Sequence, residues 1–525
     1  MEEKKVKIKF KLRIIVNNFM SYGLKEDILN RLKVYKELKE KNEDPFLITK
    51  FEISNSVEEI IKNQEKFFNR KVKVAGRILT IRRHGNLIFY DLYSNGYKIQ
   101  LAVSKDKTKN FEYAKEYIQR GDIVGCEGNV GKTIKGELTI FCEEIKILAK
   151  ALFTLPDKWF GLEDIEERYR KRHIDVILNE NVRRNFEIKV KVIQAFRNYL
   201  INRGYLDFST EIPLIQPIYG GAYAKPFITY VNDLKENWFL SISPEIYLKM
   251  LIISGFDKVF AITKNFRNES IDVTHNPEFT GFEWYEAYAD RESKLKEIEE
   301  MIYLAAKEIL GKTTIKRKIG NKEYEIDLKP PWKREKMVDL IAQYAGIDVE
   351  SASDEKIRKF LEKNNIQLKV KEYNRGLAIE EIFETFVEKN LIEPIFVLDY
   401  PIETTPLCKP LKDNPDFVER AEGYIFGMEI SNVYSELNNP IIQNKLFYEQ
   451  AKMRELGFEE AHEYDKIFVE AMMVGMPPTG GAGLGIERVL MILLELYSIK
   501  EIIYWPMLKR KNESEAVDIL TKETI

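Results

Sequence analysis

The sequence predicts an α+β protein, in which a small β-barrel domain is followed by a larger domain of strands and helices. Between Lys71 and Lys150 five short alternating runs are separated by glycine, asparagine and aspartate turns, which is typical of a compact barrel. Farther along, the stretch from Lys264 to Asp290 forms two alternating runs around a polar connection, the pattern of a β-hairpin. At 525 residues the chain is long enough for two or three domains.

Composition excludes several classes of protein. The formal net charge of −2 excludes a globally basic nucleic-acid binder and leaves any contact with RNA to local patches. Cys126, Cys142 and Cys408 show no close pairing, and the chain has four histidines and no CxxC motif, which argues against a disulfide framework and a zinc site. No run approaches the roughly 18 apolar residues of a membrane span, and the N-terminus lacks a signal-peptide core. We therefore expect a cytoplasmic protein without membrane contact.

Residues 1–65 are predicted to form a basic extension followed by a helix. Residues 4–13 alternate lysine or arginine with apolar side chains, and this pattern fits both a solvated tail and an arm that touches RNA. Residues 25–43 carry apolar side chains at helical spacing, and Asp44-Pro45 ends the run.

Residues 66–150 are predicted to form an OB-fold, because five short strands of this size suit that barrel. OB-folds present aromatic and basic side chains on one face, where bases of a single strand stack. Phe89 is the aromatic candidate for this role, and Tyr90 must then face the opposite side of the strand. Burial of Phe89 in the barrel core is the alternative.

Residues 151–175 form a charged linker, and an amphipathic helix follows it. Ile188, Val192, Phe196 and Leu200 recur every four residues, and Gly204 ends the helix. The apolar face of this helix needs a partner. Periodicity fits a second copy of the chain and an internal packing surface equally well.

The hairpin stretch concentrates charge. On a strand, side chains two residues apart share a face, so Arg267 and Glu269 are expected together, as are Glu283 and Tyr285. Asn276-Pro277 marks the turn between the two runs. The pattern fits a site for a polyanionic ligand, and an exposed hairpin rich in ion pairs is the alternative.

Three segments in order resemble the motifs of class II aminoacyl-tRNA synthetases. Gly204-Tyr205 through Pro213 resembles motif 1, residues 266–279 with Phe-Arg-Asn-Glu, His275 and Phe279 resemble motif 2, and GGAGLGIER at 480–488 resembles motif 3. The similarity to class II lysyl-tRNA synthetases extends from about residue 70 to about residue 510. It implies an α+β chain with an N-terminal OB-fold anticodon-binding domain and a class II catalytic domain at 176–525, whose antiparallel sheet is flanked by helices. It also implies a homodimer, and residues 291–420 would be an insertion.

The same resemblance implies a site for ATP and Mg²⁺. Amino-acid activation needs alignment and neutralisation of phosphate charge rather than a nucleophilic side chain, and arginines suit that task. Arg267 and Arg488 would be the catalytic residues, and Glu422 and Glu429 the ligands of Mg²⁺, a hard cation that prefers oxygen ligands. The full set of implied ATP-binding residues is Arg267, Glu269, His275, Asn276, Phe279, Glu422, Glu429 and Arg488.

Specificity for L-lysine is expected from an acidic pocket. The implied lysine-binding residues are Glu245, Glu283, Tyr285, Asn432, Tyr434 and Glu436. Buried carboxylates require a cation, which the side-chain ammonium of lysine supplies. Aspartyl and asparaginyl relatives instead carry an arginine in the strand that here holds Tyr434 and Glu436. Glu487 stands where lysyl enzymes usually have aspartate, and we expect no loss of function from it.

The OB-fold would bind the anticodon of tRNA(Lys). Arg77, Phe89, Gln100 and Glu144 are the residues implied by the resemblance, with Phe89 stacking on the middle uridine. Two alternatives remain at this stage: an aspartyl- or asparaginyl-type synthetase, and a non-catalytic synthetase-like RNA-binding protein. The second would be expected to lose Arg267, Glu269 or Arg488, and all three are present.

Overall fold

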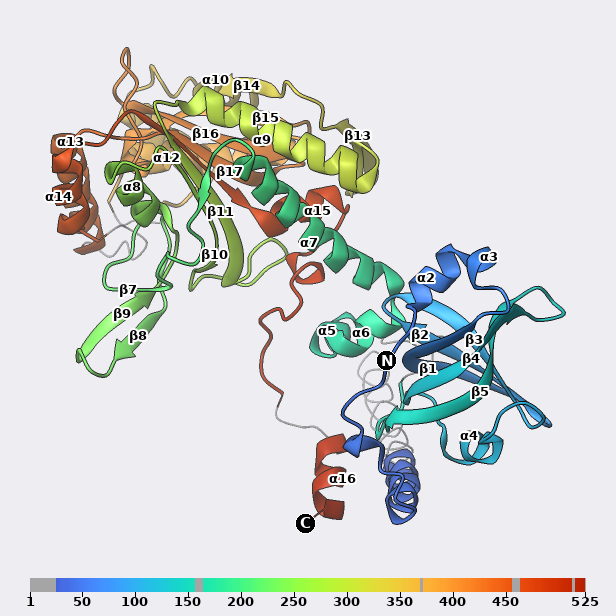
Figure 1. Cartoon of the computed structure of the whole chain (residues 1–525). Coiled ribbons are helices and arrows are strands. Elements are labelled where there is room, and N and C mark those ends of the chain that lie inside the picture. Colours follow the sequence, from blue (N-terminus) through green and yellow to red (C-terminus); the bar gives the residue numbers. More distant parts are fainter. Residues whose placement is uncertain (1–24, 156–163, 369–371, 456–462, 512–514, 525) are drawn as a thin grey trace, which may run out of the picture. The chain divides into compact units, whose positions relative to one another are not determined.

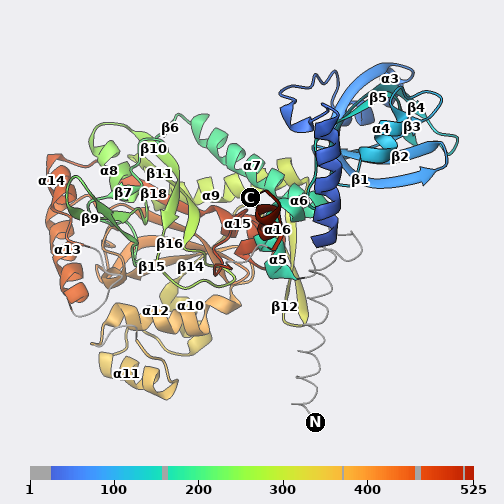
Figure 2. The same ribbon diagram turned by 90° about the horizontal axis from the view of Figure 1, so that it is seen from below.

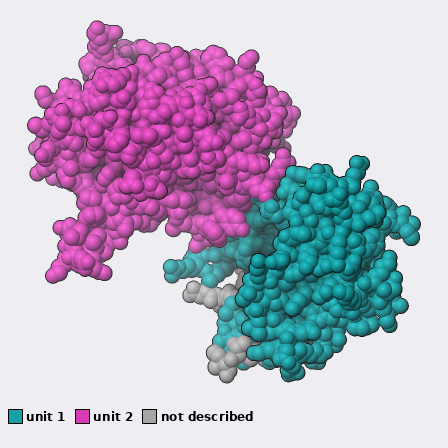
Figure 3. All heavy atoms as spheres, in the orientation of Figure 1, with its two compact units in different colours: residues 1–183, 509–525 teal, residues 184–508 magenta. Residues whose placement is uncertain are grey.

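The computed structural model describes residues 25–155, 164–368, 372–455, 463–511 and 515–524. The chain divides into two compact units, which Figure 3 shows in different colours: Met1–Arg183 with Lys509–Ile525, and Arg184–Leu508. The second unit holds most of the predicted domain at 176–525, while the end of the chain groups with the first unit. Residues 4–13, the predicted basic arm, lie outside the described residues.

The first unit contains a closed five-stranded barrel in the order β1-β2-β3-β5-β4, which confirms the predicted OB-fold (Figure 1). Its strands are β1 (Lys71–His84), β2 (Leu87–Ser94), β3 (Tyr97–Ser104), β4 (Ile123–Lys132) and β5 (Leu138–Ala149). Residues 25–40 are helical. The other helices are η1 (Pro45–Leu47), α2 (Val57–Lys62), α3 (Gln64–Phe67), α4 (Phe111–Tyr117), α5 (Ile165–Arg170), α6 (Arg172–Leu178) and α16 (Glu515–Thr524).

Alternation along β2 separates the barrel core from its outer face. Tyr90 is fully buried, and its hydroxyl donates to the carbonyl of Ala114 at 2.7 Å. Phe89 is only half-buried and points away from this core. The core also holds Cys126 and Cys142, whose Sγ atoms lie 2.7 Å apart as free thiols. Pairing of β4 with β5 thus brings together two cysteines that are distant in sequence.

The second unit is built on an eight-stranded sheet in the order β14-β15-β16-β17-β18-β11-β10-β6. Only β14 with β15 and β10 with β6 pair in parallel. The strands are β6 (Leu206–Asp207), β10 (Lys258–Phe266), β11 (Glu278–Ala287), β14 (Lys333–Lys336), β15 (Ile395–Pro401), β16 (Phe417–Ile425), β17 (Met428–Ser435) and β18 (Thr479–Gly485). Smaller sheets contain β7 (Ile215–Gln216), β8 (Ile228–Val231) and β9 (Glu236–Leu240), and β12 (Thr314–Ile319) with β13 (Lys322–Asp327).

Helices cover this sheet, and Figure 2 shows α10, α11 and α12 grouped beside β14 and β15. The segment predicted as an insertion at 291–420 thus contributes β14 and β15 to the main sheet. The helices are α7 (Glu180–Ile201), α8 (Glu245–Ile253), α9 (Arg291–Ala305), the π-helical turn η3 (Ala306–Leu310), α10 (Met337–Ala345), α11 (Asp354–Lys363), α12 (Arg375–Phe386), α13 (Pro440–Glu455), α14 (Lys466–Val474) and α15 (Ile486–Leu493). Short 3₁₀ turns are η4 (Glu388–Asn390), η5 (Ile402–Thr404) and η6 (Ile499–Glu501).

The apolar face of α7 packs inside the chain. Its residues Ile188, Val192, Phe196 and Leu200 join the largest apolar core, which also contains Phe282 and Trp284 of β11 together with parts of α9 and α15. Of the two interpretations of this helix, internal packing is the one that the structure supports. These four side chains are therefore not available to contact a second copy.

Strands β10 and β11 form the predicted antiparallel hairpin, with Phe266 paired to Glu278. Because β10 ends at Phe266, Arg267 and Glu269 lie in the connection rather than on a strand. The strand alternation that placed these two side chains on one face therefore does not apply to them. It does apply to Glu283 and Tyr285, which both lie within β11.

Candidate active site

A cavity of about 340 Å³ lies against the central strands of the second unit. Strand β18 runs between β11 and β17. Its glycines lie between side chains of β11 on one side and side chains of β17 on the other. Gly483 pairs with Glu283 on one side and Asn432 on the other, while Gly481 pairs with Tyr285 and Tyr434. Strand register thus brings the predicted lysine-binding residues of two distant segments into two short rows.

Glycine is required at one of these positions by the side chains around it. A Cβ atom at Gly481 would lie 2.0 Å from Oε1 of Glu436 and 2.4 Å from Cε1 of Tyr285. At Gly483 the nearest atom would be Cγ of Glu283 at 3.4 Å, an ordinary contact. The glycines in the sequence indicated that other atoms approach the backbone of this strand closely. In the structure, the side chains of Glu436 and Tyr285 do so at Gly481.

Among the described residues, Glu283 is held in the cavity by hydroxyl groups rather than by a lysine or an arginine. It accepts hydrogen bonds from the hydroxyls of Ser243 at 2.9 Å and Tyr285 at 3.3 Å. Burial, and next the charge of Glu245, raise the pKa of Glu283 to about 8, although Ser243, Arg267 and Tyr285 oppose this rise. A buried carboxylate with a raised pKa marks a place where a cationic ligand gains the most.

Glu245 and Glu436 already have a cation supplied by the chain. The ammonium of Lys249, which has no exposed surface, lies 2.5 Å from Oε1 of Glu245 and 2.5 Å from Oε2 of Glu436. Burial alone would lower the pKa of Lys249, but the two carboxylates raise it well above its usual value. Sequence reasoning missed this residue, although Lys249 lies four residues after Glu245 on α8, the spacing of a helical ion pair.

Arg420 is a second residue that sequence reasoning missed. Its Nε donates to Oδ1 of Asn432 at 3.1 Å, and Nδ2 of Asn432 donates to the hydroxyl of Tyr434 at 3.1 Å. The guanidinium is also paired with Glu422 and lies 3.7 Å from Glu380. Arg420 therefore fixes the orientation of the Asn432 side chain in the cavity.

The arginines of the predicted ATP site line the same cavity. The guanidinium of Arg267 lies over the ring of Phe279, 5.1 Å from its centre, and its buried Nε has no hydrogen-bond partner among the described residues. Arg488 donates to Oε2 of Glu429 at 2.9 Å, and its other terminal nitrogen lies 2.9 Å from Nε2 of His275. An unsatisfied buried guanidinium nitrogen favours an anionic ligand at Arg267.

Glu269 and Asn276 complete the predicted ATP set, and both line the cavity. Glu269 is exposed. The side chain of Asn276 is held by the backbone, since Nδ2 donates to the carbonyl of Glu278 at 2.7 Å and Oδ1 accepts from the amide of Met507 at 3.3 Å. Asn276 therefore shapes the connection between β10 and β11 as well as lining the cavity.

The two candidate magnesium ligands differ in how much hydrogen-bonding capacity they have left. Glu422 accepts from the hydroxyls of Tyr400 at 2.7 Å and Tyr424 at 2.6 Å and is paired with Arg420. Glu429 has Arg488 as its ion-pair partner and is more exposed. A carboxylate offers about four acceptor positions, so Glu429 has more capacity for a cation and Glu422 retains little. This donor set, next to two arginines, fits Mg²⁺ held mainly by phosphate oxygens and one or two carboxylates.

Glu487 lines the cavity and connects three elements there. It accepts hydrogen bonds from the amide of Thr280 on β11 at 2.9 Å and from Nζ of Lys189 on α7 at 2.9 Å. Its own helix, α15, continues with Arg488. The longer side chain at the position where aspartate is usual is thus fully used to hold α7, β11 and α15 together.

The barrel of the first unit has a second hollow, lined by Phe89 and Gln100 together with Arg82, Lys132 and Glu137. Nε2 of Gln100 donates to Oε2 of Glu137 at 2.9 Å, and the hydroxyl of Thr139 donates to Oε1 of Gln100 at 2.8 Å.

Two of the predicted anticodon residues are not among the residues that line this hollow. Arg77 donates to the carbonyl of Gly121 at 2.8 Å, and Glu144 lies 4.0 Å from Lys109. Glu137, which sequence reasoning missed, lies in the hollow instead. Glu137 comes directly before β5, and β5 pairs with β3, the strand that carries Gln100. This pairing was the available signal that Glu137 lies near Gln100.

Comparisons with known proteins agree with this architecture. The family described as "tRNA synthetases class II (D, K and N)" matches residues 164–509, and that described as "OB-fold nucleic acid binding domain" matches residues 72–148. A protein named lysine–tRNA ligase from Saccharolobus solfataricus is 44% identical over 492 residues, which cover 92% of this chain and 97% of that protein. The chain belongs to the class II lysine–tRNA ligase family.

Bacterial members of the family are similar to the same degree. Proteins of that name from Clostridium tetani and Clostridium botulinum are 43% and 42% identical, covering 92% and 95% of this chain and 96% and 99% of their own length. Within the part of the chain that the structure describes, no helix combines the length and the apolar character needed to cross a membrane.

Proposed function

We propose that this chain activates L-lysine with ATP to give lysyl-adenylate and pyrophosphate, and then transfers the lysyl group to tRNA(Lys). The observation that carries the proposal is the cavity that contains both the acidic group of Glu245, Glu283 and Glu436 and the two arginines Arg267 and Arg488. One part of this cavity suits an ammonium and the other suits phosphates. The names of the relatives agree with this substrate pair.

In the first step, a carboxylate oxygen of lysine attacks the α-phosphorus of ATP, and pyrophosphate leaves. The carboxylate is already ionised, so no side chain has to remove a proton, and the rate depends on alignment and on neutralising phosphate charge. Arg267, with its unsatisfied Nε, would contact the α-phosphate. Phe279 would stack on adenine, and Arg488 would cover the other face of the base and reach the γ-phosphate.

When bound, Mg²⁺ would neutralise charge on the phosphates, with Glu429 and Glu422 as its protein ligands. His275 lies between Asp272 and Arg488, since its Nδ1 is 2.7 Å from Asp272 and its Nε2 is 2.9 Å from Arg488. It would hold Arg488 in place for ATP. Glu269 would contact the adenine base.

In the second step, the tRNA is recognised partly through the barrel. Phe89 offers its ring for stacking on the middle uridine of the anticodon, and Gln100 and Glu137 supply a donor and an acceptor with fixed orientation. Arg77 and Glu144 would act only from outside this hollow. We further propose that the chain functions as a homodimer in the cytoplasm. In that case the second copy would contact surface other than the buried face of α7.

The experiment that tests the proposal is amino-acid-dependent exchange of pyrophosphate into ATP, measured with each of the twenty amino acids and Mg²⁺. Lysine alone is expected to support exchange. Exchange driven by aspartate or asparagine would favour the sister specificities, and the absence of exchange with every amino acid would favour a non-catalytic RNA-binding protein.

A further inference from the structure

The acidic pocket contains more carboxylates than one ligand ammonium can balance. Glu245 and Glu436 are almost fully buried in it, and Glu283 is half-buried. A buried carboxylate without a counter-charge is costly and takes up a proton instead. Among the described residues, Lys249 contributes the ammonium that lies within ion-pair distance of two of them, Glu245 and Glu436, at 2.5 Å each.

The charges then match a lysine ligand. With Lys249 in place, the three carboxylates leave two negative charges to be balanced. The α-ammonium and the side-chain ammonium of lysine supply two positive charges, and the α-carboxylate can face Arg267, whose Nε is unsatisfied. Arg420 does not change this balance, because it is paired with Glu422 and Glu380. An amino acid with a neutral side chain would leave one buried carboxylate uncompensated.

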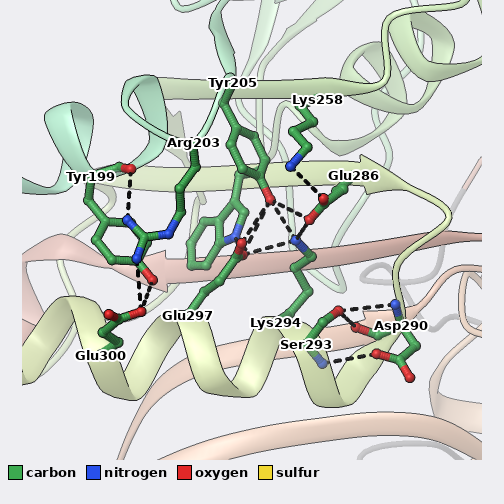
Figure 4. Close-up of polar contacts among 11 residues, drawn as sticks. Tyr199, Arg203, Tyr205, Lys258, Glu286, Asp290, Ser293, Lys294, Glu297 and Glu300 are labelled. Carbon is green, nitrogen blue, oxygen red and sulfur yellow. Dashed lines mark hydrogen bonds and ion pairs between the residues drawn. The ribbon is translucent and has the colours of Figure 1, made fainter.

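The alternative is that Lys249 is only a structural ion pair, and the chain offers a direct comparison. Lys294 also has no exposed surface and is also paired with two glutamates, Glu286 and Glu297, on the opposite face of β11. This second cluster is completed by other donors: the hydroxyl of Tyr205 lies within hydrogen-bonding distance of both carboxylates, as Figure 4 shows. The indole of Trp284 also donates to Glu297 at 2.7 Å.

The group around Lys249 is incomplete by comparison. Neither carboxylate oxygen of Glu436 accepts a hydrogen bond of good geometry among the described residues, and Oε1 lies where a Cβ of Gly481 would be. Glu436 and Gly481 both line the cavity. A polar group that is almost fully buried and unsatisfied at a cavity wall is available to a ligand.

We propose that Lys249 is a positioning and specificity residue: it is a built-in counter-cation that holds Glu245 and Glu436, so that the negative charge left in the pocket matches the two ammonium groups of a lysine substrate. This inference rests on the proposed function, because it assumes lysine as the ligand. Lys249 itself need not touch the reacting atoms. Its effect reaches the substrate through the two glutamates.

The test uses the full chain and lysine-dependent pyrophosphate exchange. In Lys249→Ala the two glutamates lose their cation and either repel each other or take up a proton. The KM for lysine is expected to rise by about tenfold or more, while the KM for ATP changes by less than about twofold. Propylammonium replaces the atoms that this substitution removes. Added to the variant, it is expected to restore part of the lysine KM, and added to the wild-type chain it is expected to bring no gain.

Lys294→Ala is the matched control. It removes an equally buried lysine and is expected to lower the melting temperature without changing the lysine KM. An unchanged lysine KM in a folded Lys249→Ala variant, or equal rescue of both variants, would overturn the inference. Failure of the wild-type chain to use lysine would instead overturn the proposed function.

A measurement on the wild-type chain covers the case in which Lys249→Ala does not fold. Burial raises the pKa of Glu436, like that of Glu283, to about 8, and the charge of Lys249 opposes this rise at Glu436. If Lys249, at 2.5 Å from both Glu245 and Glu436, nevertheless keeps these two carboxylates ionised, lysine binding near pH 7 ionises only Glu283 and releases at most about one proton. Calorimetric titration in buffers of different ionisation enthalpy measures this number. Release of about two protons would mean that Lys249 does not neutralise the pair, which contradicts the inference.

Discussion

The two faces of β11 carry glutamates in opposite electrostatic situations. Glu283 faces the cavity, where burial raises its pKa to about 8. Three residues later, Glu286 faces α9, and hydrogen bonds from Lys258 and Lys294 overcome the effect of burial and lower its pKa to about 2 (Figure 4). The carboxylates are on the same strand, and they differ in how many cationic donors surround them. A buried charge that the protein itself leaves unbalanced is the better guide to a ligand site.

The largest expected effect tests this difference directly. Glu283→Gln keeps the shape of the pocket and removes its uncompensated charge, so kcat/KM for lysine is expected to fall by about 2 to 4 kcal/mol, or roughly 30- to 1000-fold. The KM for ATP should hardly change. Pyrophosphate exchange measures both constants. Glu286→Gln is the control on the other face, and it should lower the melting temperature while keeping lysine kinetics. If both variants lost lysine kcat/KM to the same extent, Glu283 and Glu286 would not differ in their role toward the ligand.

A second pair of substitutions tests the packing of the cavity face. Gly481→Ala places a Cβ within 2.0 Å of Glu436 and 2.4 Å of Tyr285, and we expect it to cost about 1 to 3 kcal/mol in lysine binding. Gly483→Ala meets its nearest atom at 3.4 Å and should be tolerated. Lysine affinity by calorimetry, beside thermal melts, distinguishes the two. Equal tolerance at both positions would show that Glu436 moves freely.

The third prediction compares Phe89 and Tyr90, which point to opposite sides of β2 in the barrel. Phe89→Ala should reduce aminoacylation of tRNA(Lys) about tenfold to a hundredfold through the loss of about 1 to 3 kcal/mol of base stacking, with near-normal pyrophosphate exchange. Tyr90→Ala, one residue along, removes a fully buried side chain and should destabilise the barrel by about 3 to 5 kcal/mol. If Phe89→Ala instead lowers the melting temperature as Tyr90→Ala does, Phe89 is a packing residue.

The smallest expected effect is the pH dependence of stability without ligand. The pKa of Glu283 is raised from 4.5 to about 8 in the folded chain, so its contribution to stability is lost as pH rises from about 4.5 to about 8. The pKa of Glu286 is lowered to about 2, so its contribution is present above about 4.5 and is lost as pH falls toward 2. The free energy of unfolding, measured with urea across pH, should vary less between about pH 4.5 and 8 in Glu283→Gln. In Glu286→Gln it should vary less between about pH 2 and 4.5. If Glu283→Gln instead changed the acidic range and Glu286→Gln the range near neutral pH, the electrostatic environments described for the two glutamates would be wrong.

Several features could be predicted from residue order because their physics is local. Strand periodicity located the barrel and the hairpin, and alternation correctly separated Phe89 from Tyr90. The resemblance supplied the family and most of the residues that line the cavity. Alternation failed for Arg267 and Glu269, because β10 ends at Phe266, before both of them, and a connection has no fixed side-chain period.

Most partners of the charged groups in the cavity were decided by tertiary structure. The sequence identified Glu245, Glu283 and Glu436 as acidic, but only folding placed Lys249 between two of them and left the third uncompensated. It likewise paired Arg420 with Glu422, and brought Glu137 rather than Glu144 to Gln100. Periodicity fixes which way a side chain points, whereas the full set of charges around it also depends on segments that are distant in sequence, as Glu436 is from Lys249. The pKa of each carboxylate, and with it the expected chemistry of the pocket, therefore follows from packing.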